Sequence, residues 1–123
     1  MKVVYVAGPL TGKDMWEVRQ NVHLAEDWGM AIAELGGVPL MPTSNTEHFY
    51  GTLTPEFWYA ATIELLKRCD AIFLIEGWTR SKGAVAEREE AQNLGIPIFD
   101  YRDISEFEKW LAGKDVKLCM KKQ

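Results

Sequence analysis

The chain has few of the features that define several large classes of protein. Its 123 residues include only two cysteines, Cys69 and Cys119, whose spacing matches no zinc or redox motif, so we expect free thiols. No apolar run approaches the ~18 residues that a membrane span requires, so no membrane partner is expected. The 18 acidic side chains outnumber the 14 basic ones, and the net charge of -4 argues against binding a nucleic-acid polymer through its phosphates.

Signals for targeting and for cofactor binding are also missing. Met1 leads directly into the strand-like KVVYVAG, which predicts no secretory signal and makes the cytoplasm the expected location. No His, Cys and carboxylate set has metal-ligand spacing, and neither GxGxxG nor GxxxxGK[ST] occurs, so no metal and no cofactor are predicted. With 47% hydrophobic and 26% charged residues, the composition is that of a soluble globular protein. We expect one domain over residues 1–113 and a C-terminal tail at 114–123.

The order of apolar segments predicts an α/β fold. Four short runs, at residues 3–7, 38–41, 71–75 and 96–99, are continuous rather than alternating, as in parallel strands covered on both faces. Segments with helical spacing separate them, and this order predicts a flavodoxin/Rossmann-like, doubly wound parallel sheet of four to five strands. The predicted helices are 14–35, ending at Gly36 and Gly37; 54–68, starting at Thr54 and Pro55; 82–94, capped by Ser81; and a last one beginning at Asp103 or Ser105.

Two glycine-bearing loops are the predicted ligand site. In a doubly wound sheet, ligands bind beyond the carboxyl ends of the strands where the strand order reverses, usually at the loops after the first and third strands. Those loops are GPLTGKD at residues 8–14 and EGWTRSKG at 76–83. Backbone N–H groups beside Gly8, Gly12 and Gly83, with hydroxyls of Thr11 and Ser81, favour an anion. The alternative for the first loop is an ordinary tight turn.

Glu87 is the predicted reactive group. It lies on the same helical stripe as Ala84, Ala91 and Leu94, which should face the core, although a carboxylate is rarely buried without a partner. A position in the second turn of its helix lets it point into the crevice and act on an electron-poor carbon near a bound anion, as in a phosphorylated sugar or nucleotide. The alternative is a surface glutamate on a helix of different phase.

The segments VYVAGPLTG, CDAIFLIEGW and SKGAVAE resemble, in this order, the nucleoside 2-deoxyribosyltransferase superfamily, especially its small, often phage-encoded members, over residues 1 to about 100. The resemblance implies that the first loop contacts sugar or phosphate and that Glu87, four residues after Gly83, attacks the anomeric carbon. Members acting on free deoxynucleosides tend to carry an aspartate six residues before the glutamate, whereas 5'-monophosphate N-glycosidases carry a phosphate-binding serine. Ser81 stands at that position and favours a monophosphate.

One departure from the family pattern concerns the acid that assists the sugar hydroxyl or the departing base. Counting back eight residues from Asp70 gives Thr62 where the family usually has an aspartate. Glu64 is no substitute, because two residues rotate a helical side chain by roughly 200°. Either another acid acts, with Glu47, His48 and Asp70 as candidates, or the domain binds a nucleotide without turnover.

Other side chains have a functional and a structural interpretation. Tyr5 is predicted to orient Glu87 or to fill the core, Trp78 to stack on a base or to cover the core, and His48 to donate a proton or to lie exposed on its loop. Five tryptophans, and the assembly of resembling proteins, predict a homodimer or larger homo-oligomer. The predicted catalytic residues are Glu87 and Tyr5, and the predicted substrate-binding residues are Gly8, Pro9, Leu10, Thr11, Gly12, Trp78, Ser81, Gly83 and His48.

The sequence therefore predicts hydrolysis of the N-glycosidic bond of a (deoxy)nucleoside 5'-monophosphate through a covalent intermediate on Glu87. The alternatives are transfer of the deoxyribosyl group to another base, which differs only in what intercepts the intermediate, and a non-catalytic nucleotide-binding or sensing module. The expected partner in all three is a small-molecule nucleotide or nucleoside.

Overall fold

Four parallel strands form the sheet of this protein. In the computed structural model, which describes residues 1–42 and 52–112, the strands are β1 (Val3–Ala7), β2 (Val38–Leu40), β3 (Ala71–Leu74) and β4 (Ile98–Asp100), in the order β2-β1-β3-β4. All neighbouring pairs are parallel, with Tyr5 opposite Leu40 on one side and Ile72 on the other. The predicted doubly wound parallel sheet is confirmed.

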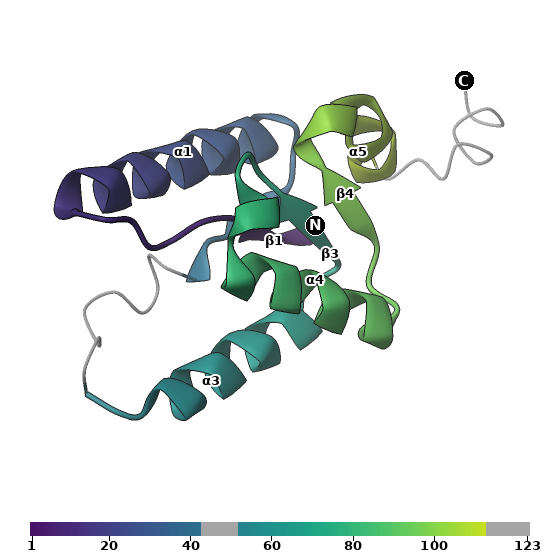
Figure 1. Cartoon of the computed structure of the whole chain (residues 1–123). Coiled ribbons are helices and arrows are strands. Elements are labelled where there is room, and N and C mark those ends of the chain that lie inside the picture. Colours follow the sequence, from purple (N-terminus) through teal and green to yellow (C-terminus); the bar gives the residue numbers. More distant parts are fainter. Residues whose placement is uncertain (43–51, 113–123) are drawn as a thin grey trace, which may run out of the picture.

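Helices cover both faces of the sheet (Figure 1). The α1 helix (Met15–Glu34) and the α5 helix (Ile104–Leu111) lie on one face, and α3 (Pro55–Lys67) and α4 (Lys82–Leu94) lie on the other. Two short 3₁₀ helices, η2 (Trp78–Arg80) and η3 (Tyr101–Asp103), follow β3 and β4. None of the helices in the described part of the chain is both long and apolar enough to cross a membrane.

Local sequence signals set where the helices begin. The side chains of Asp14, Thr54 and Ser81 each accept the backbone N–H three residues on, as helix-capping residues do. These caps precede α1, α3 and α4 and confirm the predicted starts. Asp103 precedes α5 as predicted, although its side chain makes no capping hydrogen bond.

Alternation along the central strands divides the core between the two faces. Val4 and Val6 of β1 pack toward α1 and α5, whereas Tyr5 and Ala7 pack toward α3 and α4. All four are buried, because a central parallel strand has helices on both sides. Tyr5 is thus directed toward the face that carries α4.

The α4 helix ends at Leu94 as predicted, but the exposure of Leu94 and the start of β4 differ from the sequence prediction. Leu94 was expected to face the core but is 41% exposed, and β4 begins at Ile98 rather than at residue 96. Gly95 ends the helix in the left-handed conformation (φ 73°), and the Ile96 N–H closes on the carbonyl oxygen of Ala91 at 2.9 Å. This reversal uses the residues that the prediction gave to the strand.

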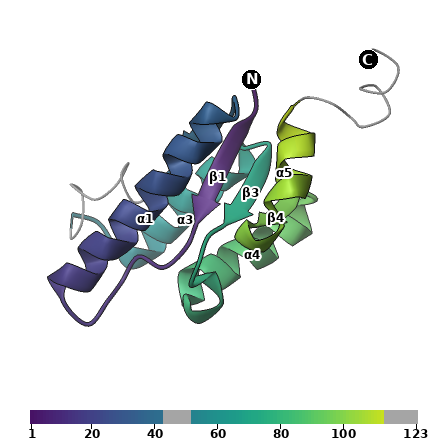
Figure 2. The ribbon, with the colours of Figure 1, turned by 90° about the horizontal axis from the view of Figure 1, so that it is seen from above.

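The strand order places the two glycine-bearing loops side by side. The chain leaves β1 toward α1 on one face and leaves the adjacent β3 toward η2 and α4 on the other, so the strand order reverses between them. Figure 2 shows β1 and β3 running in the same direction, with α1 beside β1. A crevice at such a switch point is the usual ligand site of this fold class.

Candidate active site

Tyr5 and Glu87 form a hydrogen-bonded pair between the sheet and α4. The fully buried Tyr5 side chain donates its hydroxyl to Oε2 of Glu87 at 2.5 Å. The glutamate is only partly buried, so the protein holds its carboxylate while part of the side chain remains exposed. The structure brings together the two residues predicted to be catalytic, although 82 positions separate them in the chain.

The surroundings of this pair change its protonation. Burial raises the pKa of Glu87 to about 7, and the hydrogen bond from Tyr5 opposes part of that rise. Burial, followed by the charge of Glu87, holds the pKa of the Tyr5 phenol far above its usual range. Tyr5 therefore stays a donor, while Glu87 changes charge near neutral pH, a property typical of functional carboxyl groups.

Thr62 is the third member of this group. It lies on α3, and its side chain is close enough to the Tyr5 hydroxyl for a hydrogen-bonding interaction that lowers the pKa of Tyr5. The Thr62 hydroxyl also donates to the Tyr59 carbonyl oxygen at 2.8 Å. The position where the resemblance implies an aspartate thus borders the Tyr5–Glu87 pair, and here it holds a neutral hydroxyl.

The structure excludes Asp70 as the acid that would act in place of the aspartate missing at Thr62. Asp70 accepts the Val3 N–H at 2.7 Å, next to the amino ends of β1 and β3 and hence at the edge of the sheet away from the crevice, so this candidate was wrong. Chain direction decides this, because the residue that opens a parallel strand lies a full strand length from its carboxyl end. Glu64 is exposed and pairs with Arg68 at 3.0 Å, consistent with its exclusion. The other two candidates, Glu47 and His48, lie outside the described residues.

A cavity of about 250 Å³ lies between the two loops. Among the predicted binding residues, Pro9, Thr11 and Ser81 line it, whereas Leu10 is 43% exposed and does not. Sequence reasoning missed several lining residues; a signal was present for one of them, because Arg80 directly precedes the predicted anion-binding serine. The lining residues are Pro9, Thr11, Glu17, Asn21, Gly77, Arg80 and Ser81.

The glycines of the loops have different roles. A Cβ at Gly8 would lie 2.4 Å from Cγ1 of Ile75, and one at Gly12 would lie 2.5 Å from Cβ of Glu17, so both positions need glycine for packing within the protein. A Cβ at Gly83 would meet only the Ser81 Oγ at 3.9 Å. Contact of these three glycines with a substrate remains a prediction.

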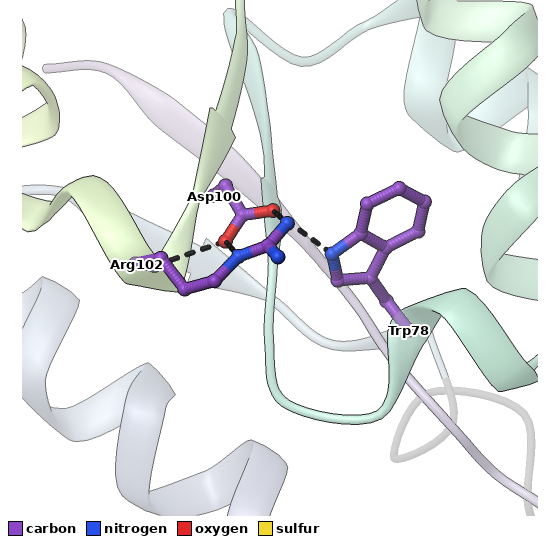
Figure 3. A network of polar contacts seen from close by, with 3 residues as sticks. All are labelled: Trp78, Asp100 and Arg102. Atoms are coloured by element: carbon purple, nitrogen blue, oxygen red, sulfur yellow. Dashed lines mark hydrogen bonds and ion pairs between the residues drawn. The ribbon is translucent and has the colours of Figure 1, made fainter.

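Trp78 is held in place by a polar network (Figure 3). Its indole N–H donates to Oδ2 of Asp100 at 2.9 Å, and Arg102 binds both carboxylate oxygens of Asp100, at 2.9 and 2.6 Å. These hydrogen bonds, with that of Arg102 first, lower the pKa of Asp100 to about 2, so the carboxylate stays charged. The ring packs against the core beside α4, with the Arg88 guanidinium 5.7 Å from its centroid. This supports the core-covering role, and stacking on a base remains a prediction.

Cys69 packs in the same part of the core as Tyr5. Cys69 is a buried free thiol whose pKa is raised to about 11 by burial and then by Asp70, while Cys119 lies outside the described residues. Within residues 1–42 and 52–112, no three His, Cys, Asp or Glu side chains are grouped so as to hold a metal ion.

The sheet, its helical cover and the crevice define a class of protein that solved structures also contain. A 2-deoxyribosyltransferase from Leishmania mexicana superimposes with a TM-score of 0.60 and 20% identity over 82% of this chain and 64% of its own. One from the psychrotolerant bacterium Bacillus psychrosaccharolyticus does so with a TM-score of 0.60 and 20% identity over 80% of this chain and 70% of its own. The present chain therefore spans slightly less than two thirds of the Leishmania protein.

The family described as "Domain of unknown function (DUF4406)" matches residues 2–100, and the chain belongs to that family. Its fold is that of the two 2-deoxyribosyltransferases, as the resemblance of its sequence motifs predicted. Comparison with curated proteins gave no significant match.

Proposed function

We propose that this protein cleaves the N-glycosidic bond of a 2'-deoxynucleoside or its 5'-monophosphate and transfers the deoxyribosyl group through Glu87. The observation that carries the proposal is the Tyr5–Glu87 hydrogen bond, which holds a partly buried carboxylate whose pKa is raised by burial to about 7. Such a group is ionised in a useful fraction at neutral pH and remains poorly solvated, which suits a nucleophile.

The reaction has two chemical steps. A carboxylate oxygen of Glu87 attacks the anomeric carbon, the carbon–nitrogen bond to the base breaks, and the base leaves with the bonding electrons and takes up a proton. An acceptor then attacks the same carbon, and the ester bond to Glu87 breaks and restores the carboxylate. Tyr5 holds the carboxylate in position during both steps and stays protonated.

The acceptor distinguishes two versions of this function. Transfer to a second base is the first candidate, because the solved proteins with this fold include 2-deoxyribosyltransferases. Hydrolysis of a nucleoside 5'-monophosphate, with water as acceptor, is the second candidate. It is favoured by Ser81 and by the cavity that Ser81 shares with Arg80. For either version we also propose a homo-oligomeric assembly in the cytoplasm.

Chromatography of base release tests the proposal directly. We expect free base from at least one member of a panel of deoxynucleosides and their 5'-monophosphates. Addition of a second free base should yield a new nucleoside or nucleotide if transfer is the reaction, and only sugar or sugar phosphate if water is the acceptor. If no base is released from any member at high protein concentration, the proposed catalytic function is wrong.

Replacing Tyr5 with phenylalanine is expected to move the pH dependence of base release. The Tyr5 hydroxyl stabilises the charged carboxylate and so lowers the pKa of Glu87, and its loss should raise that pKa above about 7. Because the nucleophile must be ionised, the acidic limb of the pH–rate profile should shift to higher pH. Tyr59→Phe, at an exposed tyrosine of α3, is the matched control. If the acidic limb of the pH–rate profile does not shift in Tyr5→Phe, Tyr5 does not influence the ionisation of Glu87.

A further inference from the structure

The first and last side chains of the short helix η2 differ in their contacts: that of Trp78 is hydrogen-bonded to the core, and that of Arg80 makes no ion pair with a described residue. Trp78 begins η2, and its indole N–H is fixed by Asp100 at the end of β4, which Arg102 holds in turn (Figure 3). Gly77, which precedes η2, adopts φ 86°, where a side chain would be strained. The contact of Trp78 with the core therefore fixes the backbone at the start of η2. Arg80 lies two residues after Trp78, at the end of this helix.

Arg80 is exposed and makes no ion pair with any residue that the structure describes. It lines the 250 Å³ cavity together with the hydroxyl-bearing residues Thr11 and Ser81. On the opposite wall, Asn21 donates its side-chain N–H to the Thr11 carbonyl oxygen at 2.9 Å and thereby ties the first loop to α1. A cation without an ion-pair partner among the described residues thus lines, with Thr11 and Ser81, a cavity whose two walls are both held in place.

We propose that Arg80 determines substrate specificity by binding the 5'-phosphate of a nucleotide in this cavity, an inference that rests on the proposed function of Glu87. The guanidinium group presents several N–H donors in a planar fork that matches phosphate oxygens, and a hydrogen bond between charged groups is stronger than one between neutral groups. A phosphorylated substrate is then preferred over the free nucleoside because only the phosphate gives Arg80 a partner.

Two neighbouring charges make the assignment specific. Glu17 lines the same cavity, and its carboxylate accepts the Lys13 N–H at 3.1 Å and pairs with Lys13 Nζ at 3.6 Å, so its repulsion of an anion is partly offset. Lys82 directly follows Ser81 and, with Arg80 and Ser81, lines a second and more open cavity along α4, but it does not line the space between the loops. Arg80 is therefore the one basic residue among those lining the space between the loops.

Binding to a non-reacting protein tests this inference without requiring turnover. In a Glu87→Gln background, calorimetry would measure the affinity of each 2'-deoxynucleoside 5'-monophosphate and of the matching nucleoside. Adding Arg80→Gln is expected to weaken nucleotide binding about tenfold or more and to leave nucleoside binding unchanged, because a charge-assisted hydrogen bond is lost. Glu17→Gln should act in the opposite direction and strengthen nucleotide binding. Arg80→Lys should restore part of the affinity.

Lys82→Gln is the matched control, since it removes the same charge two residues away. The inference would be overturned if Arg80→Gln did not weaken nucleotide binding, or if Lys82→Gln weakened it equally. It would also be overturned if Arg80→Gln weakened nucleotide and nucleoside binding equally, or if the parent protein bound no nucleotide. Arg80-dependent nucleotide binding without base release by the wild-type protein would instead refute the proposed function alone. Base release from nucleosides and nucleotides at equal rates, unaffected by Arg80→Gln, would refute the inference alone.

Discussion

Replacing Glu87 with glutamine is expected to lower base release by about 10³-fold or more, because a neutral carboxamide does not form the glycosyl ester on which both chemical steps depend. The change is nearly isosteric, and the Gln side chain still offers an oxygen to the Tyr5 hydroxyl. Single-turnover measurements with saturating substrate would separate this loss from any change in binding. Base release at the wild-type rate would show that Glu87 is not the nucleophile.

The same substitution is expected to stabilise the protein at pH 8. Burial raises the pKa of Glu87 from an ordinary value near 4.5 to about 7, so the folded state binds a proton that the unfolded state has already lost between these pH values. The free energy of unfolding of the wild-type protein should therefore fall as pH rises through this window. Removing the ionisable group should give back roughly 1–3 kcal/mol at pH 8, after allowance for partial solvation.

Denaturant unfolding of both proteins at pH 4.5 and pH 8 measures this effect. The difference between wild type and Glu87→Gln should be larger at pH 8, and Glu89→Gln, an exposed change on the same helix, should show no such pH dependence. Equal differences at both pH values would indicate that Glu87 does not titrate in the folded protein as its environment implies. Opposite effects on stability and activity would identify a side chain retained for chemistry rather than for folding.

Replacing Thr62 with aspartate is expected to raise base release by about 10²–10⁴-fold, the usual contribution of a general acid or base. Thr62 borders the Tyr5 hydroxyl, which in turn binds Glu87, so a second carboxyl group would enter an environment that already contains a partly buried one. Two neighbouring carboxyl groups do not ionise independently, and one of them keeps its proton to higher pH. That proton is then available to the departing base.

Thr62→Asn is the control, because it matches the shape of aspartate without the acid, and it should leave base release near the wild-type rate. If the wild-type protein already releases base at ordinary enzymatic rates and Thr62→Asp changes nothing, another residue supplies the proton. Glu47→Gln and His48→Ala would then be the next variants. If nucleotides raise the melting temperature but neither protein releases base, a nucleotide-binding or sensing module is the better description.

Local physical chemistry made much of this fold predictable from sequence. Continuous apolar runs identified the central strands, because a parallel strand covered on both faces has no solvent-facing side that would require polar residues. Thr54 and Ser81 marked helix starts because their side chains replace a hydrogen bond missing from the first turn. Glu87 was recognisable because a carboxylate on an apolar stripe conflicts with the pattern around it.

The site depends on relations that no local pattern contains. The pairing of Tyr5 with Glu87, the rise in the pKa of the glutamate and the contact with Thr62 all require strands and helices far apart in sequence to pack together.

Tertiary structure also placed Asp70 at the edge of the sheet away from the crevice. It brought Asp100 within hydrogen-bond distance of the Trp78 indole N–H. The physical reason is that a side chain's desolvation and its partners depend on which neighbours fill the space around it. Sequence by itself determined which residues form the strands and helices, and only packing decided which of their side chains meet.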